Sequence, residues 1–199
     1  MKHLLIIIVL QLLTACDKKE DNRLTLEEFE KQKVEQGWKK FDNGRIQGLA
    51  PETWTFKQKD STLIWFPLDY KKDIFFVAVN YNLDDVKSSS NYIHEIFNQV
   101  SSKDSTFNYK LNKIVFHNNQ YVYILKLYLP KNTFFIAVYE NDNQIYDLTY
   151  KATNEHAQTE KDYKVFFDLI LSFKVNDRRL FDSENLFVAA DQTLQISDI

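Results

Sequence analysis

Cysteine, glycine and proline are scarce in this 199-residue sequence, which holds one Cys, three Gly and three Pro. A single cysteine cannot form a disulfide within the chain or a cluster of thiolate metal ligands. The glycines Gly37, Gly44 and Gly48 lack the spacing of a phosphate-binding loop, a dinucleotide fingerprint or a Gly-x-Ser-x-Gly nucleophile elbow. These absences exclude cysteine catalysis and the enzyme classes that depend on those loops.

Blocks of basic charge are missing as well. The 25 Lys and Arg residues alternate with 28 Asp and Glu residues, for a net charge of −3. Proteins that bind nucleic acid concentrate basic residues in a patch or stripe, so no nucleic-acid partner is expected. His94, His117 and His156 are not spaced as a zinc-ligand pair and are interpreted as surface residues. We therefore expect no metal and no cofactor.

Long hydrophobic runs are absent apart from one at the start of the chain. After Lys2 and His3, the residues from Leu4 to Leu13 are apolar except for one glutamine. A membrane-spanning helix needs about 20 apolar residues, so a run of this length suits the core of a signal peptide instead. An alternative interpretation is a strand or short helix buried in the protein core.

The apolar run ends at the only cysteine, and charged residues follow at once. Leu13-Thr14-Ala15-Cys16 resembles the bacterial lipobox, Leu-x-[Ala/Gly/Ser]-Cys. The resemblance implies a signal peptide at 1–15 and a lipoprotein that carries acyl chains, including palmitate, at Cys16. Two or more chains anchor a protein stably, because each buried methylene contributes ~0.8 kcal/mol. The alternative is a buried free Cys16.

The segment 16–24 is predicted to be a short charged tether in the cell envelope of a Gram-negative bacterium. Asp17 directly after the cysteine resembles the inner-membrane retention signal of proteobacterial lipoproteins. The whole stretch CDKKED also resembles the export tags of surface lipoproteins in the Bacteroidetes group, so the periplasmic face and the cell surface both stay open. A solvated linker without a targeting role is the third alternative.

The rest of the chain is predicted to form one α+β domain at 25–175, followed by a C-terminal tail at 176–199. Thr25 and Glu28 match a capping box that begins a helix, expected to run to about Lys40. Ile93, Ile96, Phe97 and Val100 have helical spacing, and so do the apolar residues from Tyr163 to Leu171. Seven β-branched and aromatic segments between turn residues predict strands: WTFKQ, TLIWF, IFFVAVNY, FNYKLNKIVFH, QYVYILKLYL, TFFIAVYE and QIYDLTYKA.

Close spacing of these segments predicts an antiparallel sheet of about six to seven strands. IFFVAV, YVYILKLYL and TFFIAVY are almost continuously apolar. Strands of this kind are typically covered on both faces, which predicts a three-layer α/β/α sandwich with helices packed on both faces of the sheet. A two-layer α+β fold with one aromatic, partly wet face is the competing prediction.

The region from Ile46 to Phe173 is similar to PsbP-like domains. APETWTF, at Ala50 to Phe56, resembles the Pro-x-x-Trp opening strand of that family, and the last helix ends in FFDLILSF. The order of a hairpin, a strand, a helix, several hairpin strands and a final helix is also similar. The resemblance implies docking onto a larger assembly, generally without catalysis, although fold alone does not fix function.

No residue set in the sequence positively indicates catalysis. Asp84 and Asp85 precede a helix, where acids favour the helix dipole, and Asp142 and Asp147 flank a hairpin. Lys126 lies inside an apolar strand, where it is expected to reach an edge or pair with an acid. We therefore expect a non-catalytic binding or assembly module held at the membrane, with an envelope protein as its partner. An envelope enzyme acting on peptide or glycan, and a lipoprotein inhibitor or immunity protein, are the alternatives.

Surface aromatic residues are the expected means of binding. The chain holds 16 Phe, 11 Tyr and 3 Trp, more than a core of this size readily hides, and aromatic residues are enriched at interfaces. Trp38, at the end of the first predicted helix, and Trp54, in the first predicted strand, are the candidate partner-binding residues. The alternative for both is a place in the core.

The anchor prediction is tested by replacing the lipid acceptor. Cys16→Ser removes the thiol, so the protein should incorporate no labelled fatty acid and should keep its signal peptide. Metabolic labelling with an alkyne fatty acid and the electrophoretic mobility of the precursor measure both effects. Fatty-acid labelling that persists in the Cys16→Ser protein would contradict the lipobox interpretation.

Overall fold

The computed structural model describes most of the chain downstream of the predicted tether. The described residues are 25–42, 44, 46–60, 62–68, 74–103, 106–116, 119–154, 159–179 and 188–199. Cys16, the predicted signal peptide and the predicted tether lie outside this part, and so do His117 and His156.

No helix within the described ranges is both long enough and apolar enough to cross a bilayer.

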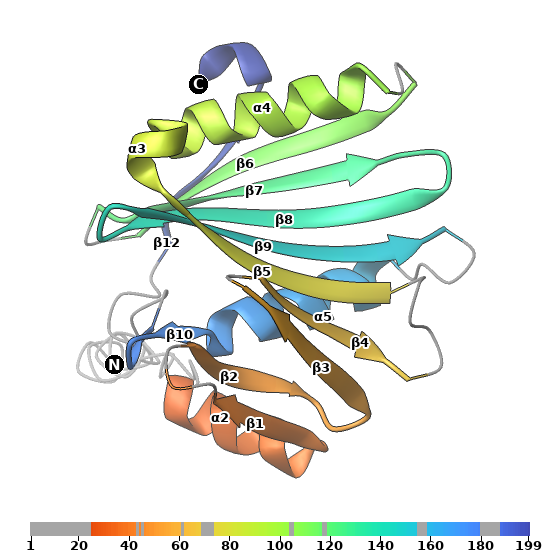
Figure 1. Cartoon of the computed structure of the whole chain (residues 1–199), viewed down its shortest axis with the longest axis vertical. Helices are drawn as coiled ribbons and strands as arrows, with labels where there is room; N and C mark the ends of the chain where they lie inside the picture. The colour runs from red at the N-terminus through yellow and green to blue at the C-terminus, as the bar shows by residue number, and fades with distance from the viewer. Residues whose placement is uncertain are drawn as a thin grey trace, which may run out of the picture.

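Eight antiparallel strands form the large sheet, in the order β12-β6-β7-β8-β9-β5-β4-β3 (Figure 1). Their bounds are β3 Trp54–Lys59, β4 Thr62–Pro67, β5 Ile74–Asn82, β6 Asn108–Phe116, β7 Tyr121–Tyr128, β8 Asn132–Asn141, β9 Gln144–Thr153 and β12 Val188–Leu194. The seven predicted segments match β3 to β9, and the antiparallel pairing is confirmed.

The predicted count of six to seven strands is too low, because β12 comes from the segment that was predicted to be a tail. β12 pairs with β6, and its register shifts between Val188 and Ala190. Its sequence VAADQTL lacks the alternating apolar pattern of the other strands. Backbone hydrogen bonds to β6 place it at the sheet edge, and hydrophobic periodicity cannot detect such a strand.

A second sheet of four strands has the order β1-β2-β10-β11. Its strands are β1 Trp38–Asp42, β2 Ile46–Pro51, β10 Lys174–Val175 and β11 Arg178–Arg179. This sheet was not predicted as a separate unit.

The first helix, α2 (Leu26–Glu35), is shorter than the sequence suggested. The Thr25–Glu28 capping box is present: the Glu28 amide donates to Thr25 Oγ1, and Glu28 Oε2 accepts from the Thr25 amide at 2.8 Å. Gly37 has a φ of +83°, a left-handed conformation that glycine adopts at low cost. The chain therefore turns at Gly37, and Trp38 begins β1 instead of ending the helix.

Helices cover both faces of the large sheet. α5 (Thr159–Ser172) packs against one face, where Phe166, Leu169 and Ile170 join a buried cluster with residues of β3 to β5 and β7 to β9. α4 (Ser89–Ser101) packs against the other face through Tyr92 and Ile93, and the one-turn helix α3 (Leu83–Val86) precedes it. The structure is thus a mixed α/β fold built on antiparallel sheets.

The small sheet lies on the same side of the large sheet as α5. Ile46, Ala50 and Val175 belong to the buried cluster that contains Phe166 and Trp65. In Figure 1 α2, β1 and β2 lie in the lowest part of the picture, and β10 lies at the left beside the end of α5. Since α5 covers the middle of the large sheet, β1 and β2 cover the end formed by β3 and β4.

Candidate functional site

A cavity of about 450 Å³ lies where β1 of the small sheet faces β3 and β4 of the large sheet. We call it the β1–β3 slot. Its walls are aromatic: Phe41 comes from β1, Trp54 and Phe56 from β3, and Trp65 from β4. The volume falls in the range of small-molecule pockets, which are mostly apolar with a few polar groups.

Trp65 forms the centre of the aromatic wall. Its ring centroid lies 4.6 Å from that of Phe41 and 5.6 Å from that of Phe56, with an interplanar angle of 28° in the second pair. Trp65 is 2% exposed, whereas Phe56 is 43% exposed. The slot therefore has a buried ring at its base and an accessible ring beside it.

The buried indole N–H of Trp65 has no hydrogen-bond partner among the described residues. An unpaired buried donor costs about 1–3 kcal/mol. Trp65, which carries this unpaired donor, is one of the residues that line the slot.

Gly48 on β2 allows Phe41 to close one wall of the slot. Phe41 and Gly48 are cross-strand partners in the β1–β2 pair. A Cβ atom at position 48 would lie 2.7 Å from Phe41 Cζ, closer than real Cβ contacts allow. The glycine therefore lets the Phe41 ring lie against β2 and reach Trp65.

A lysine of β1 lies at the mouth of the slot. Lys39 and Lys40 are exposed, and Lys39 Nζ donates to the backbone carbonyl of Glu52 at 3.0 Å. Asp42 is the acidic residue among the lining residues, and it accepts a hydrogen bond from the Gly44 amide at 2.7 Å. Side chains alternate along a strand, so Lys39 shares the face of Phe41, whereas Lys40 and Asp42 lie on the other face of β1. The Lys39 ammonium is therefore the charge that β1 brings to the mouth of the slot.

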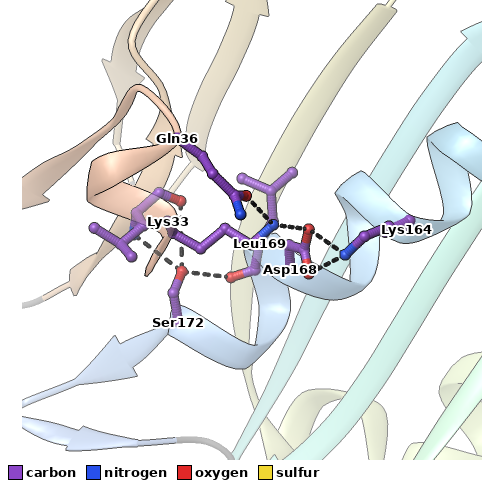
Figure 2. A network of polar contacts seen from close by, with 7 residues as sticks. Lys33, Gln36, Lys164, Asp168, Leu169 and Ser172 are labelled. Carbon is purple, nitrogen blue, oxygen red and sulfur yellow. Dashed lines mark hydrogen bonds and ion pairs between the residues drawn. The ribbon is translucent and has the colours of Figure 1, made fainter. Parts of the chain in front are cut away.

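A buried ion pair between α2 and α5 positions the chain that leads into β1. Figure 2 shows the Lys33 side chain extending from α2 to the carboxylate of Asp168 on α5. Lys33 Nζ also donates to Gln36 Oε1 at 3.3 Å, and Lys164 Nζ lies 3.1 Å from Asp168 Oδ2. Lys33 and Asp168 are 7% and 6% exposed, so each buried charge depends on the other.

Ser172, one turn after Asp168, ties α5 to the small sheet (Figure 2). The Leu49 amide donates to Ser172 Oγ at 3.0 Å, and Ser172 Oγ donates to the carbonyl of Leu169 at 2.9 Å. α5 thus holds β2 through a hydrogen bond and α2 through an ion pair, and both fix the slot wall formed by β1.

The two predicted partner-binding residues lie in different surroundings. Trp54 is 7% exposed, belongs to the core cluster and stacks on Tyr150 at 6.1 Å, although it also lines the slot. Trp38 is half-buried, and its ring centroid lies 5.0 Å from Lys33 Nζ, a cation–π contact. Whether a partner contacts either residue stays a prediction.

Three aromatic residues of the slot, Phe41, Phe56 and Trp65, were missed by sequence reasoning. Phe56 was detectable, because it lies two residues after Trp54 and shares its face of the strand. Trp65 was detectable too, since a tight turn between β3 and β4 places it opposite Phe56. Phe41 could not be detected from the sequence, because its contact with Trp65 depends on how the two sheets pack.

Two other carboxylates inside the domain, Asp147 and Asp162, accept hydrogen bonds from tyrosine hydroxyls. Tyr92 donates to Asp147 Oδ2 at 2.6 Å, and Tyr150 donates to Asp162 Oδ1 at 3.0 Å. Burial raises the pKa of Asp147, opposed by hydrogen bonds from Thr149 and Tyr92. Within the ranges that the structure describes, no three His, Cys, Asp or Glu residues are grouped closely enough to hold a metal ion.

Two further polar residues from the sequence analysis have defined contacts. Lys126 Nζ lies 3.4 Å from the centroid of the Tyr163 ring, and burial, together with Lys110, lowers the pKa of Lys126 while Asp191 opposes the shift. His94 was expected on the surface but is half-buried, and its Nε2 is 3.1 Å from the carbonyl oxygen of Ile199.

Comparison with known proteins finds a likeness of fold. No protein-family model and no curated protein sequence matches the chain. The solution structure of cyanobacterial PsbP (CyanoP) from Synechocystis sp. PCC 6803 is similar, with a TM-score of 0.52 and 11% identity over 70% of this chain and 92% of that chain. This likeness supports a PsbP-like domain. A crystal structure from Bacteroides thetaiotaomicron VPI-5482 has a TM-score of 0.36 and 9% identity over 70% of this chain and 48% of that chain.

The ion pair that holds α2 is tested by removing one charge. Asp168→Asn leaves the Lys33 ammonium buried without its counter-charge, so the free energy of unfolding should fall by about 3–5 kcal/mol. Lys164→Ala is the matched control, because it removes the other cation that contacts Asp168. The Lys164 side chain is 70% exposed, so this change should lower the free energy of unfolding by less than about 1 kcal/mol. Urea unfolding measures both. The double variant Lys33→Met/Asp168→Leu should recover most of the loss, and equal stability of Asp168→Asn and wild type would contradict the assignment.

Alanine at the two tryptophans separates core from surface roles. Trp54→Ala should reduce the free energy of unfolding by about 3–5 kcal/mol, because it opens a cavity in the core. Trp38→Ala should cost about 1–2 kcal/mol, since it removes a half-buried ring and a cation–π contact. Thermal and urea unfolding give both values. A loss of several kcal/mol at Trp38 as well would contradict a partner-binding role for both residues.

Proposed function

We propose that this chain is a lipid-anchored lipoprotein of the bacterial cell envelope that acts as a non-catalytic binding or assembly module. The observation that carries the proposal is the β1–β3 slot, an open cavity with aromatic walls and an exposed ring at Phe56. Exposed aromatic side chains beside a pocket are typical anchors for a binding partner.

Two charged residues that line the slot support binding over catalysis. General acid–base chemistry requires a titratable group within hydrogen-bond reach of a bound substrate. Here Lys39 Nζ donates to the carbonyl of Glu52, and Asp42 accepts from the Gly44 amide. Both side chains are thus engaged with the backbone.

The lipobox and the start of the fold together support a place close to the membrane. Nine residue steps separate Cys16 from Thr25, which spans at most about 30 Å. α2 adds ten residues, or about 15 Å, before the chain turns into β1. A lipid at Cys16 therefore keeps the β1–β3 slot within about 45 Å of the bilayer surface, where an envelope protein is within reach.

Site-specific photo-crosslinking in intact cells tests the proposed function. A benzophenone amino acid at Phe56 should give a discrete adduct with one envelope protein, identified by mass spectrometry. Val34, which is 46% exposed on α2, is the matched control position and should give little adduct. Combining the Phe56 probe with Cys16→Ser should reduce the yield, because the protein then lacks the acyl chains that anchor it stably. Equal adducts from positions 34 and 56, or none from either, would contradict the proposal.

A further inference from the structure

We infer that the β1–β3 slot binds a planar aromatic group that carries a negative charge next to its ring. This inference rests on the proposed binding function and specifies the chemistry of the group that enters the slot.

The shape and lining of the slot favour a flat ring. Phe41 from one sheet and Phe56 from the other approach Trp65, with ring centroids 4.6 and 5.6 Å away. The slot thus lies between two sheet faces whose rings already pack in tilted and stacked geometries, the arrangements that aromatic pairs prefer. An additional planar ring can extend this packing beside Phe56, whose side chain is the accessible part of the wall.

The charge at the mouth favours an anion. Among the described residues neither Lys39 nor Lys40 forms an ion pair, and the Lys39 ammonium is held at the rim by the carbonyl of Glu52. Lys40 and Asp42 lie on the other face of β1, because side chains alternate along a strand. A negative group at the mouth therefore meets the Lys39 ammonium, while its ring enters the apolar interior.

The aromatic lining and the charge at the mouth act together on the choice of ligand. A neutral ring gains the apolar contacts but not the contact with Lys39, and a small inorganic anion meets one exposed ammonium group in water, where such pairs contribute little. The combination predicts that an aromatic anion binds more tightly than its uncharged counterpart.

Two fluorescent probes with the same rings test the inference. 8-Anilinonaphthalene-1-sulfonate carries a sulfonate, and N-phenyl-1-naphthylamine lacks it. The sulfonate probe should bind the folded protein at one site with a Kd on the order of tens of micromolar, as expected for a ligand of about 20 heavy atoms. Binding should quench tryptophan emission by energy transfer from Trp54 and Trp65. The neutral probe should bind several-fold more weakly.

Variants with matched controls locate the site. Phe56→Ala should weaken binding of both probes at least fivefold, whereas Leu68→Ala, at another exposed apolar residue, should leave both Kd values unchanged. Lys39→Gln should weaken the sulfonate probe roughly two- to fivefold and leave the neutral probe unchanged. Lys40→Gln, at the neighbouring lysine on the opposite face of β1, is the matched control and should change neither Kd. Lys103→Gln, an exposed lysine after α4, is a second control. Circular dichroism melts check that each variant is folded.

Competition distinguishes the two natural sources of such a group. Displacement of the bound sulfonate probe by millimolar indole-3-acetate indicates a free aromatic acid. Displacement by the blocked tripeptide Asp-Trp-Asp indicates an aromatic side chain of a partner protein beside acidic residues, and either result supports the inference. Displacement by neither, equal affinity for the two fluorescent probes, or binding unaffected by Phe56→Ala would overturn it. The photo-crosslink at Phe56 reports the proposed function separately, because it does not depend on ring or charge chemistry.

Discussion

The two sheets of this protein close around the indole ring of Trp65. On the large sheet its neighbours are Phe56 of β3 and Phe76 of β5, and from the other side Phe41 and Phe173 reach it at 4.6 and 6.5 Å. A β-hairpin such as β1–β2 is marginal by itself, so it needs this contact to hold its position. Trp65 therefore unites β1, the end of α5 and the large sheet in one core, and the slot is the part of the junction that the side chains leave unfilled.

The buried ion pair of Lys33 and Asp168 adds specificity to this junction. Desolvation makes such pairs weak contributors to net stability compared with apolar residues of similar volume, yet a misplaced partner leaves a buried charge unpaired. α2 has only a thin apolar stripe, with Leu26 and the stem of Lys33 as its buried residues, so apolar packing alone specifies its register poorly. We propose that the ion pair selects one position of α2 on α5, and through Gly37 one position of β1.

The parts of the fold that were predictable carry local signals. The Thr25–Glu28 capping box, the apolar periodicity of α4 and α5, and seven aromatic strands depend on neighbours within a few residues. The missed parts depend on distant ones. β1 follows α2 because Gly37 adopts a positive φ, and β12 joins β6 through backbone pairing across more than 70 residues. The slot depends on local and distant neighbours alike. The Phe56–Trp65 pair follows from the register of the β3–β4 hairpin, whereas the position of Phe41 beside Trp65 depends on how the two sheets pack.

The lysines around the slot also follow from the exposure of two sheet edges. β1 and β3 are both terminal strands of their sheets, and unpaired strand edges invite association with other chains unless charge blocks them. Lys39 and Lys40 on β1, and Lys57 and Lys59 on β3, are exposed and meet that need. Charged side chains along the strand are enough to keep such an edge from associating with other chains. This role explains neither the cavity nor the exposed aromatic ring beside it. Phe56 lies on the same edge strand as Lys57 and Lys59 and works against protection, since an accessible ring at an edge promotes association. Retaining this ring between lysines is consistent with an edge that excludes most chains and admits a partner whose charge and ring match the slot.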